Sequence, residues 1–187
     1  MARAGCGWGG GSVPVSAGWE FLEFHPWDFM PNPTWGQNNP PLLVPFTLTN
    51  AWFTPAICFP QSDAGGSWAQ VSFLTPPDTD PTFNPEFTFH WATDVVGGGN
   101  IRLDVHYTAN ADGTVIAGGG PGTVIADTTA AANTLQITPP TQIAATGGGT
   151  WGASQIVNAN VYRGVAASSD IQGPIYVFGM IMRFRRI

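Results

Sequence analysis

The chain has 187 residues, of which 43% are hydrophobic and only 10% are charged, and its formal net charge is −6 at neutral pH. This length fits one domain with an ample core, and the negative charge disfavours nucleic-acid binding, which needs clustered cations. The 24 glycines and 17 prolines approach the range of low-complexity chains, but 12% aromatic residues, including eight tryptophans, argue against disorder and favour an all-β protein with many turns.

Residues 1–41 are rich in Gly, Pro and aromatic residues, and we expect them to form an extended N-terminal arm and loop with one strand. The first eighteen residues lack the continuous apolar core of a secretory signal, and no stretch of the chain approaches the ~20 apolar residues of a membrane span. GWEFLEFHPWDF alternates with both faces partly apolar, which predicts a strand covered on two sides. The prolines of MPNPTWGQNNPP then rule out helix and regular sheet. The arm would lie either across a neighbouring subunit or over its own sandwich.

Residues 42–187 predict a single antiparallel β-sandwich of jelly-roll-like form. We expect one or two strands in 42–59, broken at Pro45 and Pro55. Clear two-residue alternation predicts strands in WAQVSFL (68–74), FTFHWAT (87–93), NIRLDVHYTAN (100–110) and SQIVNANVYRGV (154–165). In the Ala/Gly/Thr-rich stretch 109–150, Leu135, Ile137 and Ile143 mark one or two short strands. Roughly eight to ten short strands at this spacing are typical of a sandwich or jelly roll.

The segment PIYVFGMIMRFRRI (174–187) is the most β-prone of the chain. Its run of large apolar side chains predicts a buried strand, which in a Greek-key sandwich lies within a sheet and is flanked by partners. Arg183, Arg185 and Arg186 are three of the six basic residues of the sequence, and none of the six is lysine. We expect these arginines to emerge where the strand leaves the core.

Residues with catalytic or ligand-binding chemistry are sparse, so we expect no catalytic, cofactor-binding or metal site. His90 and His106 fall on outward faces of two strands that could pair, with Asp104 beside His106, but surface histidines explain this pattern better than a metal. Asp78 and Asp80 are better explained as turn formers than as Ca²⁺ ligands. There is no Gly-x-Ser-x-Gly elbow, and the three GGG runs lack the Lys and Ser/Thr of a phosphate loop.

The two cysteines, Cys6 and Cys58, match no zinc or redox spacing. Whether they form a disulfide stays open at this point.

The C-terminal half resembles a set of tailed-phage virion proteins. The resemblance is carried by NIRLDVHYTA (100–109), VIADTTAAANTLQIT (124–138) and NANVYRGVAASSDIQGPIYVFGMIMRF (158–184). In these proteins an Asp commonly follows the pair that is Tyr162-Arg163 here; this chain has Gly164, and Asp170 in the next turn could partner Arg163 instead. The resemblance implies a jelly-roll virion component, either a head decoration (cement) protein or a fibre-head domain, and commonly a trimer.

The interpretation that we prefer is a non-enzymatic structural component of a bacteriophage virion. It would be a capsid decoration protein on the capsid surface, a homotrimer that binds the major capsid protein or other virion proteins, with no nucleic-acid, membrane or cofactor partner. Aromatic residues and arginine dominate interface energetics, so the candidate interface residues are Trp27, Phe29, Trp35, Arg183 and Arg185. Each of them could instead be internal packing.

The alternative interpretation is a tail or head-fibre module that binds a receptor, for example a host glycan. Indole faces stack on sugars and cations, and Trp35 and Trp151 lie in predicted loops where they could do so. Trp19, Trp68 and Trp91 lie in alternating strands and are expected in the core.

Overall fold

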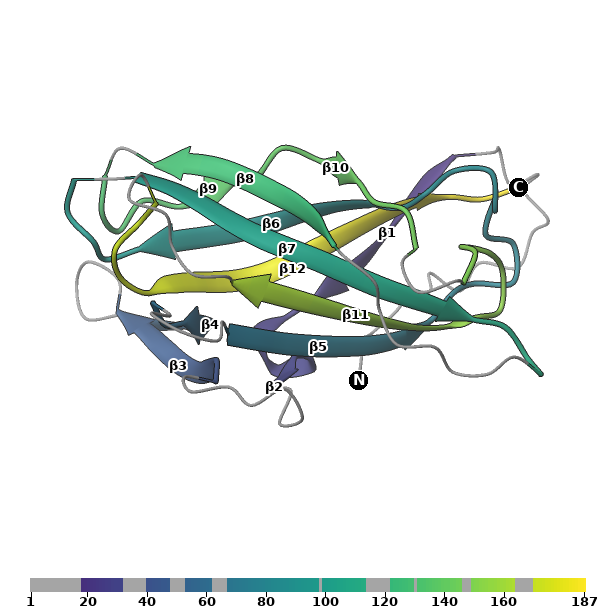
Figure 1. Ribbon diagram of the computed structural model, residues 1–187, viewed down its shortest axis with the longest axis horizontal. Helices are drawn as coiled ribbons and strands as arrows, with labels where there is room; N and C mark the ends of the chain where they lie inside the picture. Colours follow the sequence, from purple (N-terminus) through teal and green to yellow (C-terminus); the bar gives the residue numbers. More distant parts are fainter. Residues whose placement is uncertain are drawn as a thin grey trace.

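The computed structural model is a two-layer antiparallel β-sandwich (Figure 1). It describes residues 18–31, 40–47, 53–61, 67–97, 99–113, 122–129, 131–145, 149–163 and 170–187. The all-β, jelly-roll-like sandwich expected from the sequence is confirmed. Among these described residues, no helix has the length and apolar character needed to cross a membrane.

Two sheets form the layers. The seven-stranded sheet contains β1 (Trp19–Phe24), β3 (Leu42–Thr47), β4 (Phe53–Phe59), β6 (Glu86–Thr93), β9 (Gln136–Ile137), β10 (Thr141–Gln142) and β12 (Ile175–Arg185). The five-stranded sheet has the order β2 (Met30–Pro31), β5 (Ser67–Leu74), β11 (Ile156–Arg163), β7 (Gly99–Asn110) and β8 (Thr123–Thr129). In Figure 1 the second sheet, except for the short β2, forms the nearer layer, and β6 and β12 lie behind it.

The strand predicted at 174–187 is β12, and it lies inside the seven-stranded sheet. β6 pairs with it along its length, while β4 and then β1 pair with successive halves of its other edge. A register shift between Val177 and Gly179 marks a β-bulge at this changeover. Met180, Met182 and Phe184 point into the core and are at most 2% exposed. The apolar run is therefore explained by a strand with partners on both edges.

Residues 18–31 are built into the sandwich. β1 pairs with β12, the short helix η1 (Pro26–Asp28) follows, and β2 then pairs with β5 of the opposite sheet. Pro26 and Phe29 are buried where the chain crosses from one layer to the other. The predicted strand in this region is present. Its outer face is uncovered, with Phe21 61% exposed, so the prediction of a strand covered on two sides is wrong.

The core fills the space between the two sheets and follows the predicted alternation. Phe87, Phe89 and Trp91 of β6 face inward and are fully buried. They meet the inward side chains of β7 and β11, which are Ile101, Leu103, Val105, Tyr107, Val157, Ala159 and Val161. Alternating strands therefore supply the apolar layer from both sides.

Two details differ from the sequence-based expectation. Pro45 and Pro55 do not break the strands but lie opposite each other within the β3–β4 pair. A proline is tolerated there because β3 is an edge strand and β4 pairs with β12 only at 57–59. The alternation pattern also does not predict β8, whose inward, fully buried side chain is Ile125.

Candidate ligand-binding face

The outer face of the five-stranded sheet is lined by hydrogen-bonding side chains from three neighbouring strands. Alternation along β5, β11 and β7 turns every second side chain away from the core, and the register places them in rows across the strands. In the order β5, β11, β7 the rows are Trp68, Tyr162 and Asp104; Gln70, Asn160 and His106; Ser72, Asn158 and Thr108; Leu74, Ile156 and Asn110. We call this surface the polar face. Its four rows extend about 20 Å along the strands.

Aromatic side chains form one end of the polar face. Trp68 and Tyr162 are stacked, with ring centroids 4.1 Å apart and planes inclined by 24°. The His106 ring lies 5.3 Å from the Trp68 ring. Gly122 packs against this imidazole so closely that a Cβ there would lie 2.6 Å from it. These contacts hold the Trp68 and His106 rings in defined positions before any ligand arrives.

Amides and hydroxyls occupy the middle rows. The Ser72 hydroxyl donates to Asn158 Oδ1 at 2.7 Å, and Gln70 Nε2 donates to the same hydroxyl at 3.3 Å. Ser72 is exposed, while Gln70, Asn158 and Asn160 are half-buried. A sequence signal for this surface exists, because Gln70, Ser72, Asn158 and Asn160 alternate with apolar residues in two strands. Alternation by itself does not identify the surface, because it does not show that those two strands pair.

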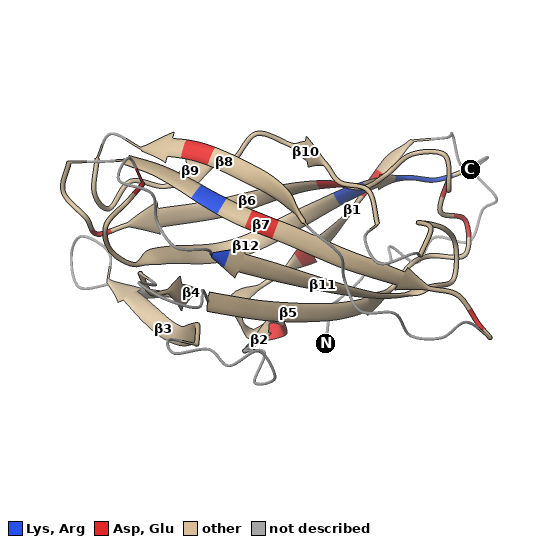
Figure 2. Ribbon diagram, viewed as in Figure 1, with Lys and Arg blue, Asp and Glu red and all other residues tan. Residues whose placement is uncertain are grey.

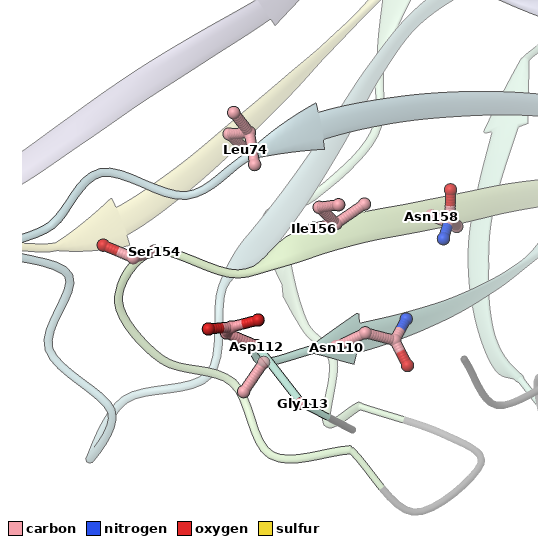
Figure 3. Close-up of a pocket in the computed structure, with 8 residues that line it drawn as sticks. Leu74, Asn110, Asp112, Gly113, Ser154, Ile156 and Asn158 are labelled. Carbon is pink, nitrogen blue, oxygen red and sulfur yellow. The ribbon is translucent and has the colours of Figure 1, made fainter. Parts of the chain in front are cut away.

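The polar face carries little charge. Figure 2 shows charge on β7 and β8 and at the end of β11, while β5 has none. On the polar face itself the acidic residue is Asp104, with Arg102 two residues before it on the same side of β7. At the row of Leu74, Ile156 and Asn110, the face ends in a hollow that these residues help to line (Figure 3).

The outer face of the seven-stranded sheet is different. There the Phe46 ring packs against those of Tyr176 and Phe178, at centroid distances of 4.7 Å and 5.3 Å, over the buried Ala56 and Ala92. The three rings of this small apolar cluster cover one another. Burial, followed by the hydrogen bond to Asp94, raises the pKa of the Tyr176 hydroxyl to about 12.

The two strand histidines lie on opposite faces of the molecule. β6 and β7 belong to different sheets, so the expectation that these strands pair is wrong, and His90 and His106 do not approach one another. In the part of the chain that the structure describes, no three His, Cys, Asp or Glu side chains are grouped so as to hold a metal ion.

Arg163 is buried at the end of β11, where both sheets meet the loop before β12. Its Nη1 and Nη2 donate to the carbonyl oxygens of Phe59, at 2.8 Å, and Ile171, at 2.9 Å. Burial lowers the pKa of the guanidinium to about 10, and the nearby Cys58 and Asp170 oppose that shift. As predicted, Asp170 interacts with Arg163, since its charge favours the charged form of the guanidinium. Gly164 lies outside the described residues.

The half-buried Cys58 is a free thiol in the structure. Burial, and then the charge of Asp94, raise its pKa, while Arg163 lowers it. Cys6 lies outside the described residues.

Three of the predicted interface residues lie near the N-terminal strands or outside the described chain. Trp27, on η1, is 57% exposed and stacks on His25 with 4.8 Å between centroids. Phe29 is 7% exposed and packs in the core, which leaves little of it for a partner. Trp35 lies outside the described residues. The interface role of these residues stays a prediction.

The two interface arginines both have partners within the chain. Arg183 forms an ion pair with Glu86, and its guanidinium carbon lies 4.4 Å from the centroid of the Trp19 ring. Arg185 stacks over Phe83 at 4.0 Å. These contacts connect β12 to β1, to β6 and to the loop before β6. The contact of Arg183 and Arg185 with another protein stays a prediction.

The aspartates of the 76–85 loop act locally. Asp80 Oδ1 accepts bonds from the hydroxyl of Thr82, at 2.6 Å, and from its N–H, at 2.9 Å, and these bonds lower the pKa of Asp80. Asp78 pairs with Arg186. Asp78 lies in the 76–79 turn, which a hydrogen bond from Thr79 N to Pro76 O closes at 3.3 Å. The turn-forming role predicted for both aspartates is confirmed, and Asp78 has the ion pair in addition.

The tryptophans are distributed differently from expectation. Trp151 is 2% exposed and packs against Tyr107 and Phe184, so it cannot be the loop platform for a sugar. Trp91 is in the core as predicted, but Trp19 is 39% exposed, and Trp68 lies on the polar face. The outward strand tryptophan Trp68, rather than the loop one, lies at the surface, where it is half-buried and stacks on Tyr162.

Comparison with known proteins identifies no family. No family model and no curated protein matches the sequence. Among solved structures, an arabinose-bound GH51 α-L-arabinofuranosidase is 11% identical with a TM-score of 0.42, covering 83% of this chain and 23% of that one. The chain therefore spans about a quarter of that enzyme.

Two further structures are similar at the same low level. A family 11 carbohydrate-binding module from Clostridium thermocellum, in complex with a β-1,3-1,4-mixed-linked tetrasaccharide, is 10% identical with a TM-score of 0.38, covering 88% of this chain and 87% of that one. The structure of infectious bursal disease virus, Gx strain, is 11% identical with a TM-score of 0.24, covering 97% and 63%. At these TM-scores the similarities carry no argument about function, and the resemblance to tailed-phage virion proteins stays a prediction.

Proposed function

We propose that this protein is a non-catalytic β-sandwich module that binds a glycan along its polar face. The observation that carries the proposal is the row arrangement itself, in which amide and hydroxyl groups of Gln70, Ser72, Asn158 and Asn160 follow one another beside a stacked aromatic pair. Glycans need both features, because their hydroxyls require directional partners and their C–H faces pack on aromatic surfaces.

A glycan suits this face better than a protein partner. The central part of a protein interface is apolar and depleted in charge, whereas the two middle rows of the polar face consist of polar side chains. A glycan chain is also long and narrow, as are the four rows centred on β11. The face needs little rearrangement, since Trp68 and His106 already have fixed neighbours.

Affinity electrophoresis in gels that contain neutral or acidic polysaccharides tests the proposal, followed by calorimetry with the retained one. We expect Trp68→Ala and Asn160→Ala to weaken binding about tenfold or more, equivalent to about 1.4 kcal/mol. Trp19→Ala, which removes an exposed tryptophan from the other sheet, is the matched control and should bind normally. Trp68→Phe keeps a ring and should bind more strongly than Trp68→Ala. Failure of the wild-type protein to be retained by any polysaccharide would reject the proposal.

A second candidate function is the structural virion component, a capsid decoration protein at the capsid surface. Its support is an apolar edge, because β3 ends the seven-stranded sheet, carries no charge, and exposes 58% of both Leu42 and Leu43. Such an edge is a template for pairing with another chain. In this proposal copies of the protein meet as a homotrimer and bind the major capsid protein, or the module sits on a tail or head fibre.

Light scattering on the purified protein tests the second candidate. We expect a trimer for the wild type and a smaller species for Leu43→Glu, which places a charge on the edge strand. Thr88→Glu, on a strand that has partners on both edges, is the control and should not change the mass. A wild-type monomer at all concentrations would contradict the homotrimer.

A further inference from the structure

A hollow of about 380 Å³ lies at the end of the polar face, where β7 ends and β11 begins (Figure 3). Its volume falls in the range of small-molecule sites. Leu74 and Ile156 contribute apolar walls and are 68% and 51% exposed. The polar side chains that line it are Asn110, Asp112, Ser154 and Asn158.

The two turns that border the hollow have defined shapes. Gly113 has a φ of 75°, a conformation that glycine adopts without strain. Ser154 has a φ of 54°, which is uncommon for a residue with a Cβ. The buried Thr75 holds the second turn, since its hydroxyl donates to Gly152 O at 2.7 Å and accepts from Gln155 N at 2.9 Å. Thr75 therefore holds the turn that carries Ser154, and a wall held in place before binding loses less entropy when a ligand binds.

The polar groups that line the hollow differ in exposure. Asn110 is 8% exposed and its Nδ2 donates to Thr108 Oγ1 at 3.4 Å, whereas Asp112 is exposed. Because Asn158 Oδ1 accepts from Ser72 on the β5 side, its amide nitrogen faces β7, as Figure 3 shows. Asn110 lies diagonally across on β7, one row further along, a spacing of about 7 Å. The Asp112 carboxylate lies on the turn directly after that strand, on the same side of the hollow (Figure 3).

We propose that this hollow is an end site that takes one uncharged sugar residue. The carboxylate of Asp112 would accept bonds from two neighbouring hydroxyls, and the amide nitrogen of Asn158, whose Oδ1 accepts from Ser72, would donate to a third. Leu74 and Ile156 provide the apolar wall for the C–H face of the ring. The described lining residues include one carboxylate and no basic side chain, which disfavours uronic or sialic acids. The inference rests on the proposed function, with the rest of the glycan lying along the polar face.

Nuclear magnetic resonance of the ¹⁵N-labelled full chain tests this site directly, with glucose, galactose and mannose as uncharged probes and glucuronate as the anionic probe. We expect at least one uncharged sugar to shift the side-chain amide signals of Asn110 and Asn158 saturably, and glucuronate to leave them unchanged. Asp112→Asn keeps the shape of the hollow and should weaken this binding about tenfold. Asp94→Asn, which changes an exposed aspartate after β6, is the matched control and should bind like the wild type.

The outcomes separate the two proposals. Absence of shifts with every uncharged sugar, equal shifts with glucuronate, or unchanged binding by Asp112→Asn would each overturn the end site. If, in that case, a polysaccharide still retains the wild type and does not retain Trp68→Ala, the polar face binds glycans without the end site. If sugar-induced shifts at Asn110 occur without polysaccharide retention, the hollow binds sugar and the long polar face does not.

Discussion

Replacement of Arg163 by methionine would test how the buried guanidinium holds one end of the sandwich together. Arg163 donates to the carbonyls of Phe59, at the end of β4, and Ile171, before β12, so one side chain of the five-stranded sheet binds two segments of the other layer. Methionine has a similar length and no donor. The substitution therefore removes both hydrogen bonds while keeping most of the packing volume.

The expected magnitude is a balance of two opposing effects. Burial lowers the pKa of Arg163 to about 10, which corresponds to about 3 kcal/mol of unfavourable charge burial that methionine would relieve. Against this, each hydrogen bond to a charged group contributes about 1.5–3 kcal/mol. The favourable charge interaction with Asp170, which is 9% exposed, is already part of that net penalty. Two hydrogen bonds outweigh the penalty, so we expect a net loss of about 1–3 kcal/mol of unfolding free energy, a sizeable part of the 5–15 kcal/mol typical of a domain.

Urea denaturation followed by tryptophan fluorescence measures this loss, since Trp91 and Trp151 are buried and report on the core. The midpoint should fall by about 1–2 M urea with an unchanged slope. Asp170→Asn should destabilise less, and the double variant should lose less than the sum of the two single ones, because both changes act on the same charge pair. A variant Arg163→Met as stable as the wild type would refute the reasoning.

Three further predictions concern stability. Thr75→Val removes the two hydrogen bonds that hold the 152–155 turn and should lower the unfolding free energy by about 2 kcal/mol, measured by urea denaturation. An unchanged midpoint would show that these two bonds do not stabilise the turn. The pKa of Tyr176 is raised to about 12, so its hydroxyl contributes fully to the unfolding free energy below pH 10, and this contribution is lost as the pH rises towards 12. Tyr176→Phe should therefore make stability fall less steeply between pH 10 and 12 in pH-dependent melting; identical slopes would contradict this. Glu86→Gln breaks a partly exposed ion pair with Arg183 and should change stability by less than about 1 kcal/mol, with the effect shrinking in high salt; a larger, salt-independent loss would mean that packing rather than charge is involved.

The candidate ligand-binding face could be predicted only in part from the sequence. Alternation in β5 and β11 identifies which side chains point outward, because successive residues of a strand face opposite sides. It does not show that Gln70 and Asn160 become neighbours, since 90 residues of chain separate them and their pairing depends on which strands share a sheet. For the same reason the outward direction of His90 and His106 is predicted correctly, but the pairing of their strands β6 and β7 is not, because these strands belong to different sheets.

Local sequence pattern by itself determined the all-β class, the inward positions of the long strands and the burial of the apolar run in β12, because a two-residue period and large apolar side chains dictate which face leaves water. Tertiary structure alone decided how those strands share edges. It gave β12 two successive partners on one side, admitted Pro45 and Pro55 where no ladder bond is needed, and buried Arg163 between the end of β4 and the segment before β12. These outcomes depend on contacts between residues far apart in the chain, and no local period encodes them.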